Sequence, residues 1–346
     1  MRVLLVSNMY PSAAKPYSGI FVKNQYEFLS RHYKHGYTWH MFAMKRMFTS
    51  RFGSLLKYVK SGLNFFGKHL LKKYDVIHLH YFFPLIVVVV VYTFFHPKTK
   101  LIVTFHGADV TNAAGNRLFK WVFSRLANNI DYTIAVGSDL KELIEKSLQC
   151  QVNRVLCAGI NEKVFYPPDH VNKEYDFVFV GSFIYRKGID IVMDSIKKLN
   201  DRSIHFCFVG SGPYMNELKD LQQNHKITIL ENQSQDELRS IYASSKFLLF
   251  PSRDEPFGLV ATESIYCGTP IIVSSAGGLK EQVNIGKTGF IANTSEEIIN
   301  IIRESLKMSE KDYHIMAANC KESNKQYSLS YVCKELKNTY DRLGNT

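Results

Sequence analysis

Short apolar runs alternate with helical patterns along the whole of this 346-residue chain. A strand that is buried on both faces reads as a continuous apolar run, and strand–helix alternation is typical of parallel sheets built from βα units. The pattern therefore predicts an α/β fold of two doubly wound, Rossmann-like domains. The expected strands cover residues 2–7, 38–43, 75–79, 101–105, 131–136, 176–180, 204–209, 227–230, 246–250, 270–273 and 289–291. The expected helices cover residues 18–32, 54–72, 84–95, 115–128, 138–148, 188–199, 213–223, 235–244, 258–267, 295–306 and 328–343.

The linker-like stretch around Pro167 and Pro168 separates two series of such units. It predicts an N-terminal domain at residues 1–166 and a C-terminal domain at 167–327. Ligands bind doubly wound sheets at the carboxyl ends of the strands. We therefore expect the active site in a cleft between the two domains.

The run from Pro84 to Phe95 is strongly apolar, but it is only about a dozen residues long. Crossing a bilayer takes about 20 apolar residues, so we expect a buried helix behind the first sheet. The chain starts with a short strand-like run instead of a signal segment, and its six cysteines form no C-x-x-C pair. A cytoplasmic protein with reduced cysteines is the natural expectation.

The segment from Asp254 to Ser264 carries the most specific chemistry. Glu255 and Glu263 stand eight positions apart, separated by an EPFG turn and an expected helix start. A buried strand ends at Pro251 just before it. Backbone N–H groups are exposed where a helix begins, here beside fixed carboxylates. This geometry suits a ligand with both anionic oxygens and hydroxyls, such as a nucleotide-sugar.

Arg186 and Lys187 form a second candidate anion site. They precede Gly188 between an expected strand and the next helix. Helix N–H groups and the helix dipole attract anions at such a place. Two adjacent cations there are suited to holding a diphosphate and stabilising its charge as it leaves.

Three further segments are candidate parts of the site. His106 and Asp109 follow the expected strand 101–105, where Asp109 either orients an acceptor hydroxyl or caps a helix. Gly19, in the long first βα connection, allows backbone N–H groups to approach a phosphate. Gly212 belongs to a tight turn that we expect to line a nucleotide pocket. No D-x-D motif and no His/Cys ligand cluster calls for a metal.

The net charge of +12 is concentrated in the first half of the chain. Residues 1–165 hold 22 Lys and Arg against 8 Asp and Glu, which gives +14. The basic segment 45–73 interleaves cations with large apolar side chains and contains no acidic residue. That composition suits an interfacial helix on an anionic membrane, with an ordinary solvated helix as the alternative. Nucleic acid is a weaker candidate partner because no binding motif accompanies the charge.

Several segments together resemble the family 4 glycosyltransferases, over essentially the whole chain from Val3 to about Leu343. They are the E-x7-E pair with EPFG, and three segments in the family's order: residues 104–109, 180–188 and 277–281. The resemblance implies a GT-B fold and sugar transfer with retention. We expect no cofactor, since the nucleotide-sugar is a substrate. The resemblance also implies that the last helix folds back on the first domain.

The resemblance assigns roles to individual residues. Glu255 would contact hydroxyls of the donor sugar and stand near its anomeric carbon, and Glu263 would hold the ribose hydroxyls. His106 would lie against the donor sugar, and Glu281 would border the acceptor and donor. Family members carry an Arg where this chain has Ser182, so either Arg186 supplies that charge or Lys187 binds the diphosphate alone. The backbone N–H groups that would touch phosphate or sugar belong to Phe257, Gly258, Leu259 and Val260.

The leading hypothesis is transfer of a sugar from a UDP- or GDP-sugar to a hydroxyl of a glycan or lipid-linked glycan. We expect a role in cell-surface polysaccharide or lipopolysaccharide synthesis, at the inner face of the membrane. The alternatives are a nucleotide-sugar epimerase or a phosphorylase-like enzyme of the same architecture, and an inactive partner subunit. Product from donor alone would indicate epimerisation, and donor binding without turnover would indicate the inactive subunit.

Overall fold

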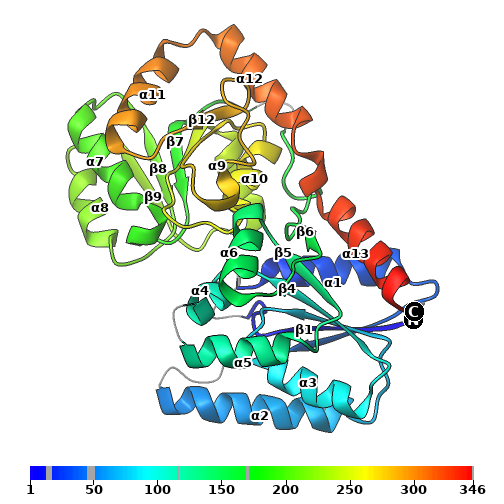
Figure 1. Ribbon diagram of the computed structural model, residues 1–346. Helices are drawn as coiled ribbons and strands as arrows, with labels where there is room; N and C mark the ends of the chain where they lie inside the picture. Colours follow the sequence, from blue (N-terminus) through cyan, green and yellow to red (C-terminus); the bar gives the residue numbers. More distant parts are fainter. Residues whose placement is uncertain (13–17, 45–50, 115–116, 169–170, 345–346) are drawn as a thin grey trace. The chain divides into compact units, whose positions relative to one another are not determined.

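The computed structural model describes residues 1–12, 18–44, 51–114, 117–168 and 171–344, without the side chains of 51–57, 112–114 and 117–119. The chain folds into two compact units (Figure 1). Unit 1 comprises Met1–Gly159 and Leu329–Thr346, and unit 2 comprises Ile160–Ser328. The division falls a few residues before the proline pair that suggested a boundary in the sequence.

Unit 1 is built on a parallel sheet of six strands in the order β2-β1-β3-β4-β5-β6. Its central strands are buried along their length because helices cover both faces. Strand order reverses between β1 and β3, since the chain first moves from β1 to β2 and then crosses to the other side. The strands are β1 (Arg2–Ser7), β2 (Thr38–Ala43), β3 (Val76–His80), β4 (Lys100–Phe105), β5 (Tyr132–Ala135) and β6 (Arg154–Val155).

Right-handed crossovers place α1 on one face of this sheet and α2, α3 and α5 on the other. The last helix, α13, joins α1 and packs against β3. There Tyr340 contacts the Nδ1 atom of His78 at 2.7 Å, which ties the helix to the sheet. The helices are α1 (Ile20–His32), α2 (Arg51–His69), α3 (Leu85–Phe95), α4 (Ala108–Ala114), α5 (Arg117–Ala127), α6 (Ser138–Leu148) and α13 (Leu329–Gly344).

Unit 2 repeats this plan with a parallel sheet in the order β12-β11-β10-β7-β8-β9. Strand order reverses between β7 and β10, which lie side by side although β8 and β9 separate them in sequence. The strands are β7 (Tyr175–Val180), β8 (Phe206–Val209), β9 (Ile227–Leu230), β10 (Ser245–Phe250), β11 (Ile271–Val273) and β12 (Gly289–Ile291).

The helices of unit 2 form two packed groups, α7 with α8 and α11, and α10 with α9 and α12. Two of them start with capping boxes, at Ser234 and Thr294, where side chains satisfy the free N–H groups of the first turn. The helices are α7 (Ile189–Leu199), α8 (Met215–Gln222), α9 (Gln235–Ala243), α10 (Leu259–Tyr266), α11 (Ser295–Lys307) and α12 (Glu310–Glu322). Short 3₁₀ turns are η1 (Tyr185–Lys187), η2 (Gly277–Leu279) and η3 (Lys325–Tyr327).

The structure corrects three expectations about elements. The helix expected at 115–128 is present as α5, but the helix α4 before it was not expected, because it is too short to show a period. Helix α12 was not expected, because it buries only Met316 and Cys320 and so carries a faint apolar pattern. Helix α3 lies behind the sheet as expected, but one of its sides is exposed to solvent. Among the described residues, no helix is both long enough and apolar enough to cross a membrane.

Candidate functional site

The predicted donor residues of unit 2 lie at the carboxyl edge of its sheet. The loop after β7 carries Lys187, and the loop after β10 carries Glu255. Since β7 and β10 are paired parallel strands at the reversal of strand order, their loops emerge next to each other. A reversal of this kind is where doubly wound sheets bind ligands.

Lys187 and Glu255 form an ion pair between these two loops, from Nζ to Oε2. Both side chains are largely buried, with 17% and 13% of their surface exposed. The Lys187 Nζ also lies over the ring of Phe250, 5.5 Å from its centroid. The neighbouring pair, Arg186 with Asp254 at 3.3 Å, is about half exposed. Of the two predicted cations, Lys187 is therefore the one that is held in place.

Two glycines allow the loops to pack this closely. Gly188 adopts a φ of 73°, and a Cβ there would lie 2.0 Å from the carbonyl oxygen of Pro251. Gly277 adopts a φ of 55°, and its Cβ would lie 1.9 Å from the carbonyl oxygen of Glu255. Any other residue would push the loops apart. Gly188 is thus required for the close approach of the two loops, and Gly277 is required for the packing of η2 against Glu255.

The EPFG turn ends where α10 begins. Gly258 is the residue before the helix, and Leu259 and Val260 form its first turn. Their N–H groups belong to the set that has no partner within the helix. Phe257 is buried and packs edge-on against Tyr327, with ring centroids 5.0 Å apart. The turn is therefore anchored by an apolar side chain while its backbone forms a helix start.

Gln282 supports this turn, and no sequence pattern pointed to it. Its side chain is almost fully buried and its Nε2 donates to the carbonyl oxygen of Phe257. Its Oε1 accepts a hydrogen bond of 2.6 Å from Thr262 on α10. The amide thereby fixes the turn to the helix that follows it. The predicted residue Glu281 precedes it, just beyond η2, and is half-buried.

Glu263 points from α10 toward Tyr242, whose hydroxyl donates to its Oε2 at 2.9 Å. Burial raises the pKa of Glu263 to about 7, and the hydrogen bond from Tyr242 lowers it in part. The carboxyl group thus titrates near neutral pH. It is suited to accepting hydroxyl hydrogen bonds that would complete its coordination.

Arg253 is a further residue that sequence reasoning missed. Its guanidinium binds both carboxylate oxygens of Asp190 at 2.7 Å and stacks on Tyr185 at 3.7 Å. Its backbone N–H donates to the carbonyl oxygen of Arg186 at 2.8 Å. Arg253 therefore clamps η1 to the loop after β10. No local pattern links Arg253 to a carboxylate 63 positions away.

The remaining predicted donor residues lie near this edge or beside it. Gly212 follows β8, and a Cβ at this position would lie 2.5 Å from the carbonyl oxygen of Phe183 in the loop after β7. Ser182 is exposed in that same loop. A cavity of about 610 Å³ is lined by Asp190, Arg253, Ser275 and Asn293, among others.

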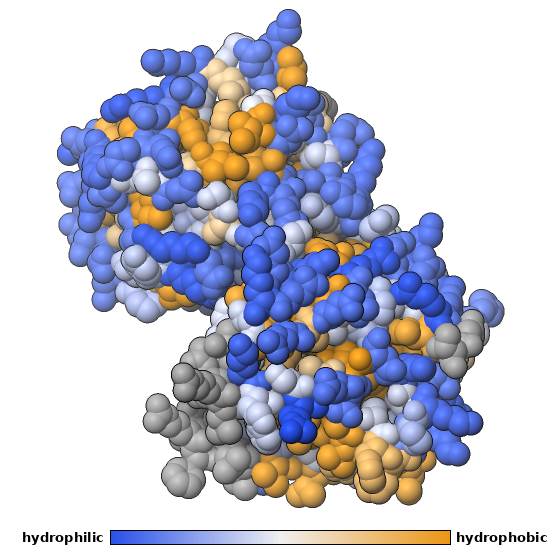
Figure 2. Space-filling model, viewed as in Figure 1, coloured by the Kyte–Doolittle hydropathy of each residue, from blue (hydrophilic) through white to orange (hydrophobic). Residues whose placement is uncertain are grey.

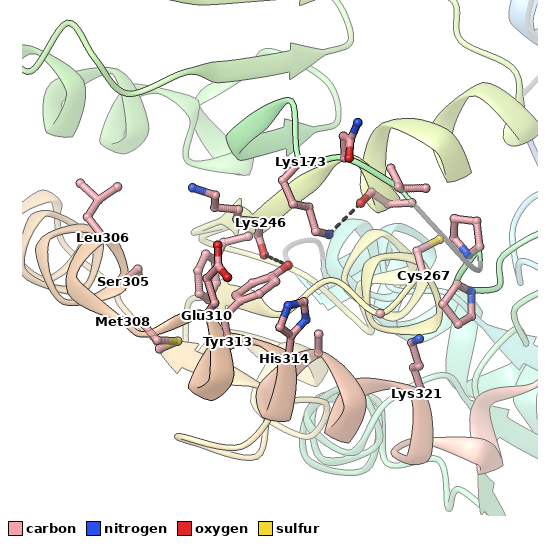
Figure 3. A pocket seen from close by; sticks show the side chains of 18 residues that line it. Lys173, Lys246, Cys267, Ser305, Leu306, Met308, Glu310, Tyr313, His314 and Lys321 are labelled. Atoms are coloured by element: carbon pink, nitrogen blue, oxygen red, sulfur yellow. Dashed lines mark hydrogen bonds between the residues drawn. The ribbon is translucent and has the colours of Figure 1, made fainter.

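A second cavity of unit 2, of about 530 Å³, lies at the opposite edge of the sheet (Figure 3). Its lining includes Lys173, just before β7, and Lys246, near the start of β10. The Lys173 Nζ donates to two backbone carbonyls, of Ala243 and Ser245, at 2.7 and 2.8 Å. Its position at the amino ends of the strands separates this cavity from the predicted donor residues.

In unit 1, His106 follows β4 at the carboxyl edge of the sheet. Its ring stacks on Tyr81, with centroids 4.4 Å apart, and its Nε2 lies 3.3 Å from Nδ1 of His80. Burial holds the pKa of His106 well below its usual range, and the neighbouring His80 lowers it further. Burial also lowers the pKa of His80 to about 3. Both rings are therefore neutral at physiological pH.

Asp109 is tied to the backbone of unit 1. Its Oδ1 accepts from the N–H groups of Gly107 at 2.9 Å and His106 at 3.2 Å, and its Oδ2 accepts from Phe82 at 3.0 Å. Burial raises the pKa of Asp109, and these hydrogen bonds lower it in part. Of the two roles expected for Asp109, the geometry favours the structural one. The carboxylate thereby fixes the position of His106 relative to the loop after β3.

Gly19 lies at the start of α1 with a φ of 70°, and a Cβ there would lie 2.5 Å from the carbonyl oxygen of Met9. It is close to the end of β1, where Asn8 donates to the carbonyl oxygen of Phe83 at 2.9 Å. The described residues hold no group of three His, Cys, Asp or Glu side chains suited to a metal ion. The expectation of a site between the two domains stays a prediction.

Family models match the two units separately. The model for glycosyl transferases group 1 matches residues 161–326. The model for glycosyltransferase family 4 matches residues 25–163. A relative, the uncharacterized glycosyltransferase MJ1178 of Methanocaldococcus jannaschii, is 29% identical over 293 residues, which is 81% of this chain and 79% of that protein.

Solved structures share the fold. The structure of Anabaena Alr3699/HepE in complex with UDP and glucose superposes with a TM-score of 0.74 at 16% identity, over 99% of this chain and all of that chain. Sucrose-phosphate synthase from Thermosynechococcus elongatus gives a TM-score of 0.77 at 20% identity, over 99% of both chains. The two six-stranded α/β units thus form a GT-B fold.

Proposed function

Because the chain belongs to the family 4 glycosyltransferases, which are retaining enzymes that use nucleotide-sugar donors, we propose that it transfers a sugar to a hydroxyl of a glycan or lipid-linked glycan. The pathway that we propose is synthesis of a cell-surface polysaccharide or lipopolysaccharide. The donor is a UDP- or GDP-sugar. The presence of UDP and glucose in the Anabaena structure supports UDP for a protein of this fold.

The ion pair of Lys187 with Glu255 at the carboxyl edge of the sheet, together with Glu263 on the helix that follows, carries this proposal. The two carboxylates present acceptors for sugar hydroxyls, with the start of α10 between them. The cation Lys187 lies beside one of these carboxylates. A nucleotide-diphosphate-sugar combines hydroxyls with a diphosphate, which is the chemistry that this set of groups recognises.

Each group has a distinct role in the proposed reaction. Glu255 binds hydroxyls of the donor sugar and stabilises positive charge near its anomeric carbon. Lys187, with the exposed Arg186 beside it, offsets the negative charge of the leaving diphosphate. Glu263 accepts hydrogen bonds from the ribose hydroxyls, and His106 is the residue from unit 1 that contacts the donor sugar.

We place the enzyme in the cytoplasm, peripherally at the inner face of the membrane. The basic segment 45–73 supports this proposal only in part, because residues 45–50 and the side chains of 51–57 lie outside the described structure. The described remainder of the segment contains Lys60, Lys68, Lys72 and Lys73, whose side chains are exposed. Proximity to anionic lipid would suit an acceptor that is carried on lipid.

A panel of nucleotide-sugars tests the donor assignment by thermal shift and turnover. A ligand at 100 times its Kd stabilises the fold by about 2.7 kcal/mol, so the cognate donor should raise the melting temperature by several degrees. Release of nucleotide should require an acceptor. Product from donor alone would point to an epimerase, and donor binding without turnover would point to an inactive subunit. A flat response across the panel would contradict the donor assignment.

A further inference from the structure

We propose that the outer side of α3 is a surface that inserts into an anionic lipid bilayer. The surface consists of Val87, Val91, Phe94 and Phe95, here called the apolar stripe. This inference rests on the proposed lipid-linked acceptor, and it goes beyond the basic segment 45–73 because α3 lies outside that segment. It names the element that enters the membrane.

Helix α3 is apolar on all sides, but the described residues cover only one of them. The side that faces the sheet buries Leu85, Ile86, Val89 and Tyr92. On the other side Phe94 is 81% exposed and Phe95 is 61% exposed, and Val87 and Val91 are more than one-third exposed. A helix that is hydrophobic all round is normally buried in protein or in lipid. The apolar stripe therefore lacks a covering layer within the described part of the chain.

Neighbouring elements extend this surface. Helices α2 and α5 flank α3 on the same face of the sheet (Figure 1). Gly62 of α2 approaches Val88 of α3, and the next residue, Leu63, is exposed. Leu71, just past α2, is 95% exposed, and Trp121 on α5 is largely exposed as well. Figure 2 shows hydrophobic residues gathered at the lower edge of unit 1, where Figure 1 places α2 and α3.

The stretch of sequence that carries the apolar stripe is basic. Between residues 58 and 98 the chain has five lysines and one acidic residue, Asp75. Asp75 is engaged within the fold, because its Oδ2 accepts from the backbone N–H of Arg2 at 2.6 Å. The exposed lysines that form no ion pair with any described residue are Lys68, Lys72, Lys73 and Lys98.

The positive charge of these lysines indicates which partner covers the apolar stripe. A second copy of the chain would bring the same lysines to the interface, and like charges would repel. A surface of anionic headgroups instead attracts each lysine while its acyl region receives the aromatic rings. Trp121 is of the residue type that prefers the boundary between headgroups and acyl chains. Charge and hydrophobicity together therefore favour anionic lipid over a protein partner.

Flotation of the full-length chain with vesicles tests the proposal. One set of vesicles contains phosphatidylcholine alone, and the other contains phosphatidylcholine with one-third phosphatidylglycerol. The wild-type chain should float only with the anionic vesicles. The double substitution Phe94→Ser and Phe95→Ser should weaken partitioning by at least about tenfold, since two large apolar side chains no longer enter the lipid.

Ile315→Ser is the matched control, because Ile315 is 51% exposed on α12 of unit 2. It should leave partitioning unchanged. The substitutions Lys72→Gln and Lys73→Gln should weaken binding and reduce its dependence on salt. As a second measurement, Trp39→Phe leaves Trp121 as the only tryptophan of the chain, and its emission should shift to shorter wavelength on anionic vesicles.

Two results would overturn the proposal. One is equal flotation of the wild-type chain and the Phe94/Phe95 double variant. The other is a dimer, seen by light scattering without lipid, that the double variant abolishes. Thermal shift with nucleotide-sugars on the same samples distinguishes a failure of the membrane proposal from a failure of the proposed transferase function. A chain that binds donor but ignores vesicles retains the proposed transferase function and loses only the membrane surface.

Discussion

Lys187 and Glu255 form an ion pair although 68 positions separate them in sequence. The pairing follows from sheet topology, because β7 and β10 are neighbours and both loops emerge at their carboxyl ends. In the proposed reaction Lys187 also binds the diphosphate of the donor, and Glu255 also binds its sugar. The ion pair therefore holds both side chains in place before the donor arrives.

Glu255→Gln and Lys187→Ala should each lower kcat by roughly 100-fold or more, because each removes charge that stabilises the transition state. The double variant should lose less than the product of the two effects, since the partners share one contact. Steady-state kinetics with the cognate donor measures both. Lys246→Ala is the control, because it breaks the ion pair with Asp176 at the opposite edge of the same sheet. An equal loss in the control would remove the case for a catalytic role.

Donor affinity should rise with pH through about 7, as Glu263 loses its proton and its carboxylate becomes a better acceptor for hydroxyls. Tyr242→Phe removes a hydrogen bond that lowers the pKa of Glu263, so the midpoint should move to higher pH. Titration calorimetry with the nucleotide from mildly acidic to mildly alkaline pH measures the shift. Tyr266→Phe, which removes a hydroxyl bonded to the carbonyl oxygen of Asn324, should leave the midpoint unchanged.

The same carboxyl group predicts a trend in stability. The pKa of Glu263 is raised from 4.5 to about 7 by folding, so the folded chain keeps a proton that the unfolded chain has released. Stability should therefore fall as pH rises from 4.5 to about 7, by about 3 kcal/mol at most. In urea unfolding, Glu263→Gln should remove this part of the pH dependence. An unchanged slope in the variant would show that another group is responsible.

Asp109→Ala should destabilise unit 1 by about 3 kcal/mol or more, because it leaves three N–H groups, two of them buried, without an acceptor. Asp131→Ala is the comparison, since this carboxylate accepts from the N–H of Leu101 at 2.8 Å and is partly exposed. Its effect should be smaller. Loss of transfer without any loss of thermal stability would instead favour the acceptor-orienting role for Asp109.

Gly277→Ala should lower both stability and turnover, since its Cβ would overlap the carbonyl oxygen of Glu255. Gly67→Ala should instead raise the stability. Gly67 is an exposed helical residue in α2, and a Cβ there would meet no atom within 4 Å, so alanine should stabilise by up to about 1 kcal/mol. Thermal melts of the two variants give opposite signs if the close approach at Gly277 is the cause.

The strands could be predicted from the sequence, and so could the edge of the sheet at which Lys187 and Glu255 lie. Buried strands such as β4 and β10 are short apolar runs, and a parallel sheet leaves one edge for its ligand loops. The EPFG turn could be predicted as well, because its residue types are specific. The pairing of Lys187 with Glu255 required the strand order, which apolar patterning alone does not contain.

The residues that support the candidate site could not be predicted from the sequence, for a different reason. Gln282 and Arg253 work through partners 25 and 63 positions away, and neither stands in a pattern of its own. The exposed side of α3 was also missed, because periodicity detects a helix that is polar on one side. An entirely apolar helix gives no signal of which side meets solvent.

The first and last residues of unit 2 lie next to each other, since Ile160 and Ser328 form a β-bridge. Unit 1 has its last helix, α13, after that point, and there Arg154 pairs with Glu335 and Tyr37 with Asp341. On the ribosome, unit 2 can thus finish folding before unit 1 has received its final helix. A nascent chain released early would contain a complete second unit beside a first unit whose sheet is still uncovered at β3.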